Sequence, residues 1–226
     1  MKRAIIFDSG TLISFAMNGL FEELRGLKQI FRGNFLITED VKREIIDKPI
    51  KIKRFELEAL RLKKLVDEKV LELPSDVGLN QGEILKRGTE IMKAANELFQ
   101  SEKQGIHLID IGEASCLAIS EILTKQGVKN VIAVDERTIR MLTENPDGLK
   151  NFLQKKMHTK IYSKKGDFSL FKSFRFIRSA ELLYVAFKKG VVKLKGDAVL
   201  DALLYAVKFK GCSISNEEIN EIKKIK

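Results

Sequence analysis

Short apolar segments, each ended by a polar residue, alternate along the chain with longer segments of helical periodicity. Residues 4–7 end at Asp8, residues 35–37 end at a threonine, and residues 130–134 end at Asp135. Short, fully apolar runs are typical of strands that are buried on both faces of a sheet. The alternation therefore predicts an α/β domain with a central, mainly parallel sheet.

The remaining elements follow from apolar spacing and from turn residues. Further strands are expected at 70–73 and 174–177. Helices are expected at 11–32, 39–47, 54–68, 81–102, 111–126, between Asp135 and about 144, and at 179–189, 198–210 and after the capping box of Ser215 and Glu218. The pattern is least clear over 149–173. Because no linker or repeat is found, we expect a single domain over 1–226, with a basic insertion at about 146–173.

The excess positive charge is confined to one part of the chain. The 41 Lys and Arg and 31 Asp and Glu leave a net charge of +10. Residues 1–150 carry 24 of each, whereas residues 151–210 carry 14 basic and 4 acidic side chains. Such a surface attracts polyanions, most often nucleic acid, and the alternative is the lysine-rich surface of a heat-adapted protein.

Several classes of protein are excluded by what the sequence lacks. Two cysteines, Cys116 and Cys212, are too few for a disulfide framework and suit a reducing cytosol, so we expect a cytoplasmic protein. The longest run without a charged residue, 9–21, has 13 residues and is too short to span a bilayer, so no membrane partner is expected. The first strand ends in a segment similar to the D-x-D-G-T-L motif of haloacid dehalogenase-type phosphatases. Phe7 and Ser9 replace both of its aspartates, which excludes that site.

Acidic residues stand where predicted strands end or helices begin. Asp8 and Asp135 follow strands directly, and open parallel sheets bind ligands at the carboxyl ends of their strands. Asp110 and Glu113 share one face at the beginning of a helix, and Glu44 lies early in another. Each also has a structural alternative, since Asp110 and Glu113 have the spacing of a capping box, Asp135 has the place of an N-cap, and Glu44 fits an exposed helix position.

Taken together, these residues lie in motifs that resemble PIN-domain nucleases of archaeal and bacterial type. The motifs are D-S-G-T-L-I from Asp8, T-x-x-V-x-x-E ending at Glu44, D-I-G-E-A-S-C-L-A from Asp110, and V-I-A-V-D-E-x-x-x-R ending at Arg140. The resemblance covers roughly 1–144 and 174–226, and it implies a three-layer α/β/α fold. Three features depart from the family: the insertion, Asp-Glu in place of Asp-Asp, and Arg-Ser in place of Gly-Thr before a late helix.

The resemblance implies a metal-dependent endoribonuclease that hydrolyses RNA phosphodiester bonds. In the family, carboxylates hold one or two Mg²⁺ or Mn²⁺ ions, which suits the preference of these cations for oxygen ligands. The catalytic and metal-binding roles carry over to Asp8, Glu44, Glu113 and Asp135, with Asp110 as a further metal ligand. Ser9 is a candidate for a hydroxyl at the site, and Arg140 is a candidate to orient Asp135 or to bind phosphate.

The late basic segment supplies candidates for contacts with RNA phosphates. They are Lys155, Lys156, Lys160, Lys164, Lys165, Arg175 and Arg178. Tyr162, Phe168 and Phe171 are candidates for stacking on unpaired bases, with packing inside the domain as the favoured alternative.

Two other functions fit the same residues. One is a non-catalytic RNA-binding or assembly module on this scaffold, because a fold does not determine a function. The other is the toxin half of a toxin–antitoxin pair, which adds an antitoxin-like protein partner. Homodimers are common in the family. The helix with Leu200, Leu203, Leu204 and Val207 offers an interface, although the domain's own core is the favoured place for these side chains.

Overall fold

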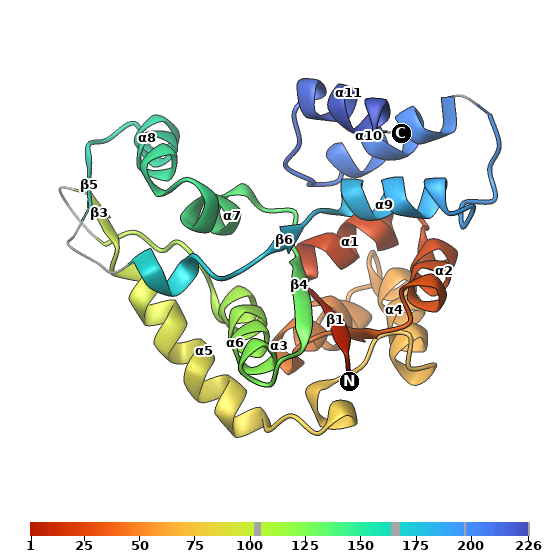
Figure 1. The fold of residues 1–226 in the computed structure, drawn as a ribbon, viewed down its shortest axis with the longest axis horizontal. Coiled ribbons are helices and arrows are strands. Elements are labelled where there is room, and N and C mark those ends of the chain that lie inside the picture. Colours follow the sequence, from red (N-terminus) through yellow and green to blue (C-terminus); the bar gives the residue numbers. More distant parts are fainter. Residues whose placement is uncertain (102–104, 164–167, 197, 226) are drawn as a thin grey trace.

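A four-stranded parallel sheet forms the centre of the molecule, which we describe from a computed structural model (Figure 1). The structure describes residues 1–101, 105–163, 168–196 and 198–225. The strand order is β2-β1-β4-β6. These strands are β1 (Arg3–Phe7), β2 (Asn34–Leu36), β4 (Lys129–Ala133) and β6 (Phe176–Ile177). All three pairings are parallel, so the carboxyl ends of the strands lie at one edge of the sheet.

Helices connect the strands and cover both faces of the sheet. They are α1 (Ser9–Met17), α2 (Phe21–Phe31), α3 (Glu39–Lys42), α4 (Glu56–Asp67), α5 (Gln81–Asn96), α6 (Ile111–Lys125), α7 (Arg137–Glu144), α8 (Pro146–Met157), α9 (Ser179–Lys188), α10 (Ala198–Lys208) and α11 (Asn216–Lys224). Short turns of other helix types are η1 (Arg43–Asp47), η2 (Pro49–Lys51), η3 (Pro74–Val77) and η4 (Phe168–Phe171). The α/β class and the three-layer arrangement predicted from the sequence are confirmed.

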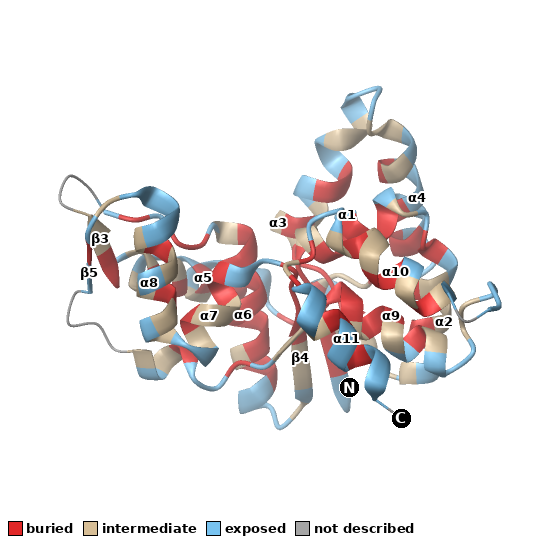
Figure 2. Cartoon of the chain, turned by 90° about the horizontal axis from the view of Figure 1, so that it is seen from above, coloured by how far each residue is buried: buried red, intermediate tan, exposed pale blue. Residues whose placement is uncertain are grey.

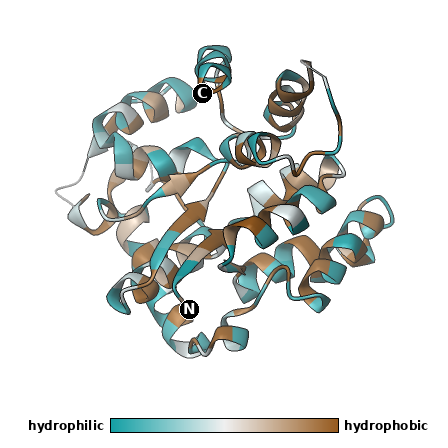
Figure 3. Cartoon of the chain, turned by 45° about the vertical axis from the view of Figure 1, so that its right-hand side comes forward, coloured by the Kyte–Doolittle hydropathy of each residue, from teal (hydrophilic) through white to brown (hydrophobic). Residues whose placement is uncertain are grey.

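The core lies on both faces of β1 and β4. Helix α6 packs on these strands and is covered in turn by α5, so it is buried nearly all round. On the other side, α1, α2 and α10 pack around α9. The strands are largely apolar and lie between the helices, as Figure 3 shows. The buried residues form one cluster from Ala4 to Ile222, which includes all four apolar side chains of α10 considered above as an interface.

The first two predicted elements that differ are in the amino-terminal half. The expected helix over 11–32 is two helices, because Gly19 adopts a φ of 70° between α1 and α2, a conformation that favours glycine. The expected strand over 70–73 is reduced to one isolated parallel bridge between Glu72 and Leu36. Pro74 begins η3 immediately afterwards and ends the pairing.

The region 81–173 also differs from its prediction. Helix α5 ends at Asn96, and β3 (Phe99–Ser101) follows it. Helix α7 ends at Glu144, as expected, but α8 begins directly afterwards and was not predicted; Asn145 is its N-cap and Pro146 lies in its first turn, where the missing N–H is tolerated. Strand β5 (Ile161–Ser163) then pairs with β3 in a small antiparallel sheet. The segment expected as an insertion is thus joined to residues before α6.

Within the described ranges, no helix is long and apolar enough to cross a membrane.

Candidate active site

A cleft of about 470 Å³ lies at the carboxyl ends of β1 and β4. All the acids predicted as metal ligands line it: Asp8, Glu44, Asp110, Glu113 and Asp135. They come from the ends of two strands, from η1 and from the first turn of α6. Parallel pairing places these strand ends and helix beginnings at one edge, where open parallel sheets bind their ligands. Figure 2 shows this region between α6 and α1, with buried segments at its centre.

Asp8 joins the end of β1 to the beginning of α1. Its backbone N–H still donates to Ala133 of β4, at 2.9 Å, and its carboxylate Oδ2 caps α1 by accepting the N–H of Gly10 at 3.1 Å. The residue is 7% exposed. Ser9 also lines the cleft, as predicted for a candidate hydroxyl. The cap thus fixes a nearly buried carboxylate at the floor of the cleft.

Asp110 and Glu113 form the capping box that their spacing suggested. The Asp110 carboxylate accepts the Glu113 N–H, and the Glu113 carboxylate accepts the Asp110 N–H, both at 3.1 Å. Both side chains also line the cleft. The capping-box alternative is therefore correct, and the same arrangement places two carboxylates together at the helix end that borders the cleft.

Glu44 reaches the cleft from a π-helical turn. In η1 the neighbouring Ile45 and Ile46 are buried in the core while Glu44 is exposed. Its Oε2 lies 3.6 Å from the position that a Cβ on Gly112 would occupy. Because Gly112 has no side chain, the amino-terminal end of α6 comes close to this carboxylate, and the partial positive charge of the helix end favours it there.

Asp135 is held far more firmly than the other acids. Its Oδ2 accepts the hydroxyls of Ser14 and Ser179, and its Oδ1 accepts the backbone N–H of Ser179, each at 2.8 Å. It is 2% exposed. It does not cap α7, since Glu136 occupies the N-cap position. These three bonds use most of the about four lone-pair sites of the carboxylate, and the Cys212 thiol also interacts with it.

Arg178 lies behind this site and not at its surface. Its guanidinium is paired with Glu181 and, at 2.7 Å, with Glu218 of α11, and its side chain is 9% exposed. Both glutamates raise its pKa, although burial alone lowers it. Because these partners and the surrounding core occupy the guanidinium, we withdraw Arg178 from the predicted contacts with RNA.

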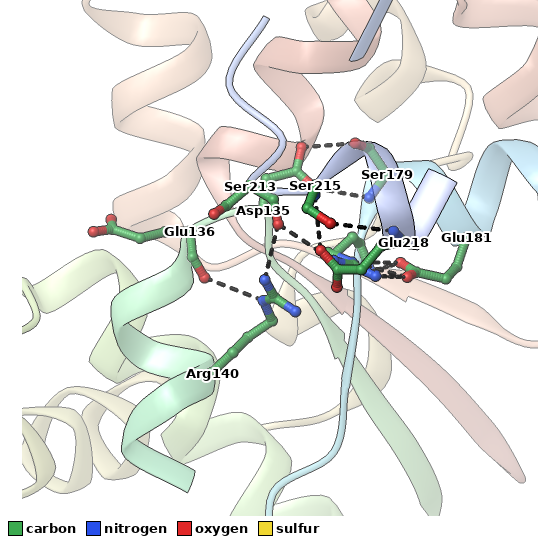
Figure 4. Close-up of polar contacts among 9 residues, drawn as sticks. Asp135, Glu136, Arg140, Ser179, Glu181, Ser213, Ser215 and Glu218 are labelled. Carbon is green, nitrogen blue, oxygen red and sulfur yellow. Dashed lines mark hydrogen bonds and ion pairs between the residues drawn. The ribbon is translucent and has the colours of Figure 1, made fainter. Parts of the chain in front are cut away.

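Arg140 acts on the backbone next to Asp135. Its Nη2 donates to the carbonyl oxygen of Ser213 at 3.0 Å, and Arg178 donates to the same oxygen at 3.3 Å (Figure 4). The Ser213 N–H in turn donates to the Asp135 carbonyl at 3.0 Å. Arg140 therefore stabilises the backbone at the wall of the cleft. It does not bond the Asp135 carboxylate, although orienting Asp135 was one of its two expected roles.

Burial and mutual repulsion raise the pKa of two carboxyls in the cleft. Burial is the largest cause for Asp8, whose pKa rises to about 7, with Asp110 and Glu44 adding to the rise and backbone N–H groups opposing it. For Glu113 the pKa rises to about 9, first through burial and then through the charges of Asp8 and Glu136. Such shifts mark a site where negative charge lacks compensation, and a bound cation supplies that compensation.

These residues match a divalent cation in chemistry. Every predicted ligand offers carboxylate oxygens, the donors that Mg²⁺ and Mn²⁺ prefer. Among the described residues, no three His, Cys, Asp or Glu side chains are already arranged to hold a metal ion. Side chains such as Glu44, which is exposed, would have to turn toward a common point to complete a coordination shell.

The predicted RNA contacts are placed in different parts of the molecule. Lys156 lines the cleft, whereas Lys155 and Lys160 are exposed outside it. Arg175 lines a separate depression with Lys129, toward the amino-terminal end of β4. Lys164 and Lys165 lie outside the described residues.

The three aromatic candidates for base stacking have different surroundings. Phe171 is 1% exposed, so the favoured alternative, packing inside the domain, is confirmed for this side chain. Phe168 packs edge to face on Phe99, with ring centroids 5.8 Å apart. Tyr162 is 39% exposed, so its stacking on bases stays a prediction.

Sequence reasoning did not list several residues of the cleft among its candidates. They are Glu136, Arg137, Phe152, Lys210 and Ser213, and Ser14 supports the cleft through its bond to Asp135. Glu136 and Arg137 follow Asp135 directly, so adjacency to a strand-end acid was an available signal. Ser14 faces Asp135 because α1 packs beside β4, a contact between residues 121 positions apart for which the sequence carries no signal.

No protein-family model, curated protein or solved structure matches this chain. The resemblance to PIN-domain nucleases therefore stays a prediction from the motifs of the sequence.

Proposed function

We propose that the protein is a metal-dependent ribonuclease that hydrolyses phosphodiester bonds in RNA. One observation carries the proposal: acids that are far apart in the sequence, and that the motifs had singled out, line a single cleft at the carboxyl edge of the sheet. A purely structural role for each acid would not require them to share a cleft. The two free cysteines are both buried, in keeping with a cytoplasmic location.

Each acid has a role that its surroundings suggest. Asp8 and Glu113 are nearly buried at the floor and would hold Mg²⁺ or Mn²⁺, with Glu44 and Asp110 completing the ligand set from the rim. Asp135 anchors the floor to α1 and α9 through its three hydrogen bonds and lines the same cleft as the other acids. When bound, such a cation supplies Lewis-acid chemistry at the phosphodiester.

The test is cleavage of a mixed single-stranded RNA pool, with Mg²⁺ or Mn²⁺ against EDTA. We expect cleavage by the wild-type protein that EDTA abolishes and that Asp8→Asn and Glu113→Gln remove. Glu83→Gln is the matched control, because Glu83 also lies in the first turn of a helix, α5, but does not line the cleft. Its cleavage rate should equal that of the wild type.

Three results would contradict the proposal. Cleavage that persists in EDTA would exclude a metal-dependent reaction, and cleavage that survives both substitutions would place the activity elsewhere or in a contaminant. If no variant cleaves RNA while all bind it with a steep salt dependence, the non-catalytic RNA-binding module replaces the nuclease.

A further inference from the structure

The acidic cleft also has a basic side, of which the sequence predicted only Lys156. Arg137, Lys156 and Lys210 line the same cleft as the carboxylates, and all three side chains are exposed. None of the three forms an ion pair with any described residue, although acids line the cleft beside them. Cations that border a cleft without a partner of their own have charge available for a ligand.

Phe152 positions two of these cations. The Arg137 guanidinium carbon lies 5.6 Å from the centroid of the Phe152 ring, and the Lys156 Nζ lies 5.9 Å from it. Cations at this range are attracted to the face of an aromatic ring. Phe152 itself lines the cleft and packs against the core cluster. The packed pair α7 and α8 thus presents two charges from one ordered patch.

Lys210 comes from a different part of the fold. It follows α10, and its carbonyl oxygen accepts the Ser14 hydroxyl at 3.3 Å, the same hydroxyl that bonds Asp135. Figure 1 shows α8 on one side of the carboxyl end of β4 and α10 on the other. The basic groups therefore border the carboxylate floor from two separate elements.

We propose that Arg137, Lys156 and Lys210 form a phosphate-binding subsite that holds a single strand of nucleic acid across the carboxylates. The inference rests on the proposed function and adds the path and the strandedness of the substrate. A polyphosphodiester carries regularly spaced negative charges, so a strand crossing the cleft places phosphates near both basic sides and one phosphate over the acidic floor. The volume of the cleft is in the range of small-ligand sites, about 300–1,000 Å³, which favours one extended strand over a duplex.

The experiment measures binding without requiring cleavage. A short labelled single-stranded RNA is titrated by fluorescence anisotropy over a range of salt concentrations, in EDTA and again with Ca²⁺, so that turnover is separated from affinity. The test variant combines Arg137→Gln, Lys156→Gln and Lys210→Gln. The control combines Lys189→Gln, Lys193→Gln and Lys195→Gln, which removes the same charge from exposed lysines that lie outside the cleft and are not candidate RNA contacts.

We expect the cleft variant to bind more weakly than the control. Each phosphate contact on a single strand contributes about 0.7 to the slope of log affinity against log salt, so losing three contacts lowers that slope by about 2. The control should keep most of the wild-type slope. Circular dichroism and thermal unfolding establish that both variants are folded. Single-stranded DNA should respond like RNA, because contacts of this kind do not read the base or the sugar.

Equal losses in the two variants would overturn the inference, since they would show a diffuse basic surface without a subsite. Tighter binding of duplex than of single-stranded RNA would overturn it as well. A wild-type protein that binds RNA through the cleft residues but cleaves nothing would refute the nuclease and leave the subsite standing. If Asp8→Asn abolishes cleavage but the cleft variant cleaves and binds RNA like the wild type, the nuclease stands and the phosphate-binding subsite is refuted.

Discussion

Replacing Asp8 by asparagine is predicted to stabilise the metal-free protein at alkaline pH. Asp8 is 7% exposed, and burial raises its pKa from 3.8 to about 7. Because the pKa of Asp8 is higher in the folded protein than in the unfolded chain, the contribution of protonated Asp8 to the free energy of unfolding is present in full below about pH 4. That contribution is lost progressively as the pH rises from about 4 through 7. At pH 8 the cost of ionised Asp8 is about 4 kcal/mol, from about three pKa units at 1.36 kcal/mol each. Asparagine cannot ionise and retains an oxygen for the Gly10 N–H.

The assay is urea unfolding in EDTA at pH 8 and pH 4, with free energies from linear extrapolation. We expect Asp8→Asn to raise the free energy of unfolding by up to about 4 kcal/mol at pH 8. At pH 4 it should change by less than about 1 kcal/mol, because folded wild-type Asp8 is protonated there and unfolded Asp8, with a pKa of 3.8, is about 40% protonated. Addition of Mg²⁺ or Mn²⁺ should stabilise the wild type more than the variant, because ligand binding to the folded state adds to its stability.

Asp135→Asn is the matched control, because it removes the same charge from the end of a neighbouring strand. Its carboxylate accepts three hydrogen bonds from serines, and an amide offers only one oxygen to them. We expect a loss of about 1–3 kcal/mol at pH 8. If Asp8→Asn is as destabilising as Asp135→Asn, or if its gain is the same at both pH values, the assignment of Asp8 as a buried, uncompensated charge is refuted.

Three further predictions concern the rest of the fold. Gly26→Ala should lower the free energy of unfolding, because the new Cβ would lie 2.3 Å from Val191 Cγ1; an unchanged urea midpoint would contradict this. Arg178→Met should lower the free energy of unfolding by about 1–3 kcal/mol, because Glu181 and Glu218 lose their partner while staying partly exposed to water; an unchanged free energy of unfolding would contradict this. Cys116 and Cys212, whose pKa values burial raises, should react with a thiol reagent only on unfolding, which the rate of labelling in native buffer tests.

The strands and the acids at their ends could be predicted because the signal is local. A short apolar run followed by an acid places that acid at the carboxyl edge, and parallel pairing brings Asp8 and Asp135 to one cleft. The capping box of Asp110 and Glu113 is equally local, since its two partners are three residues apart. Where a few adjacent residues determine the geometry, the sequence was sufficient.

Predictions failed where a local pattern has two structural outcomes. Asn145-Pro146 ends one helix and begins the next, because proline is excluded from a helix interior but accepted in a first turn. The apolar residues at 70–73 suit a strand, but Pro74 leaves room for a single bridge. In both cases the structure of the segment depends on contacts with elements that are distant in the sequence, and the local sequence does not reveal those contacts.

The positions of basic residues in the sequence were a poor guide to which of them can bind RNA, because a cation that is already paired with an acid in the fold has no charge available for a ligand. Arg178 belongs to the basic segment and reads as a phosphate contact, yet Glu218, 40 residues later, pairs with it behind the site. Lys210 was not a candidate and lies at the cleft. Net charge predicts that a polyanion binds; only the fold separates cations that have partners from cations that do not.

The same reasoning distinguishes the two strand-end acids. Asp8 and Asp135 are equivalent in the sequence, each directly after a buried strand, and both are nearly buried in the structure. Ser14 and Ser179 satisfy Asp135 from 121 and 44 residues away, whereas Asp8 has a cap bond and repulsive neighbours. A cation that enters the cleft therefore relieves Asp8 and competes with existing hydrogen bonds at Asp135. Asp8→Asn should consequently weaken the binding of Mn²⁺ more than Asp135→Asn does. A calorimetric titration of the two folded variants tests this. The opposite order would show that the hydrogen-bonded Asp135 carboxylate, and not the uncompensated charge of Asp8, holds the metal.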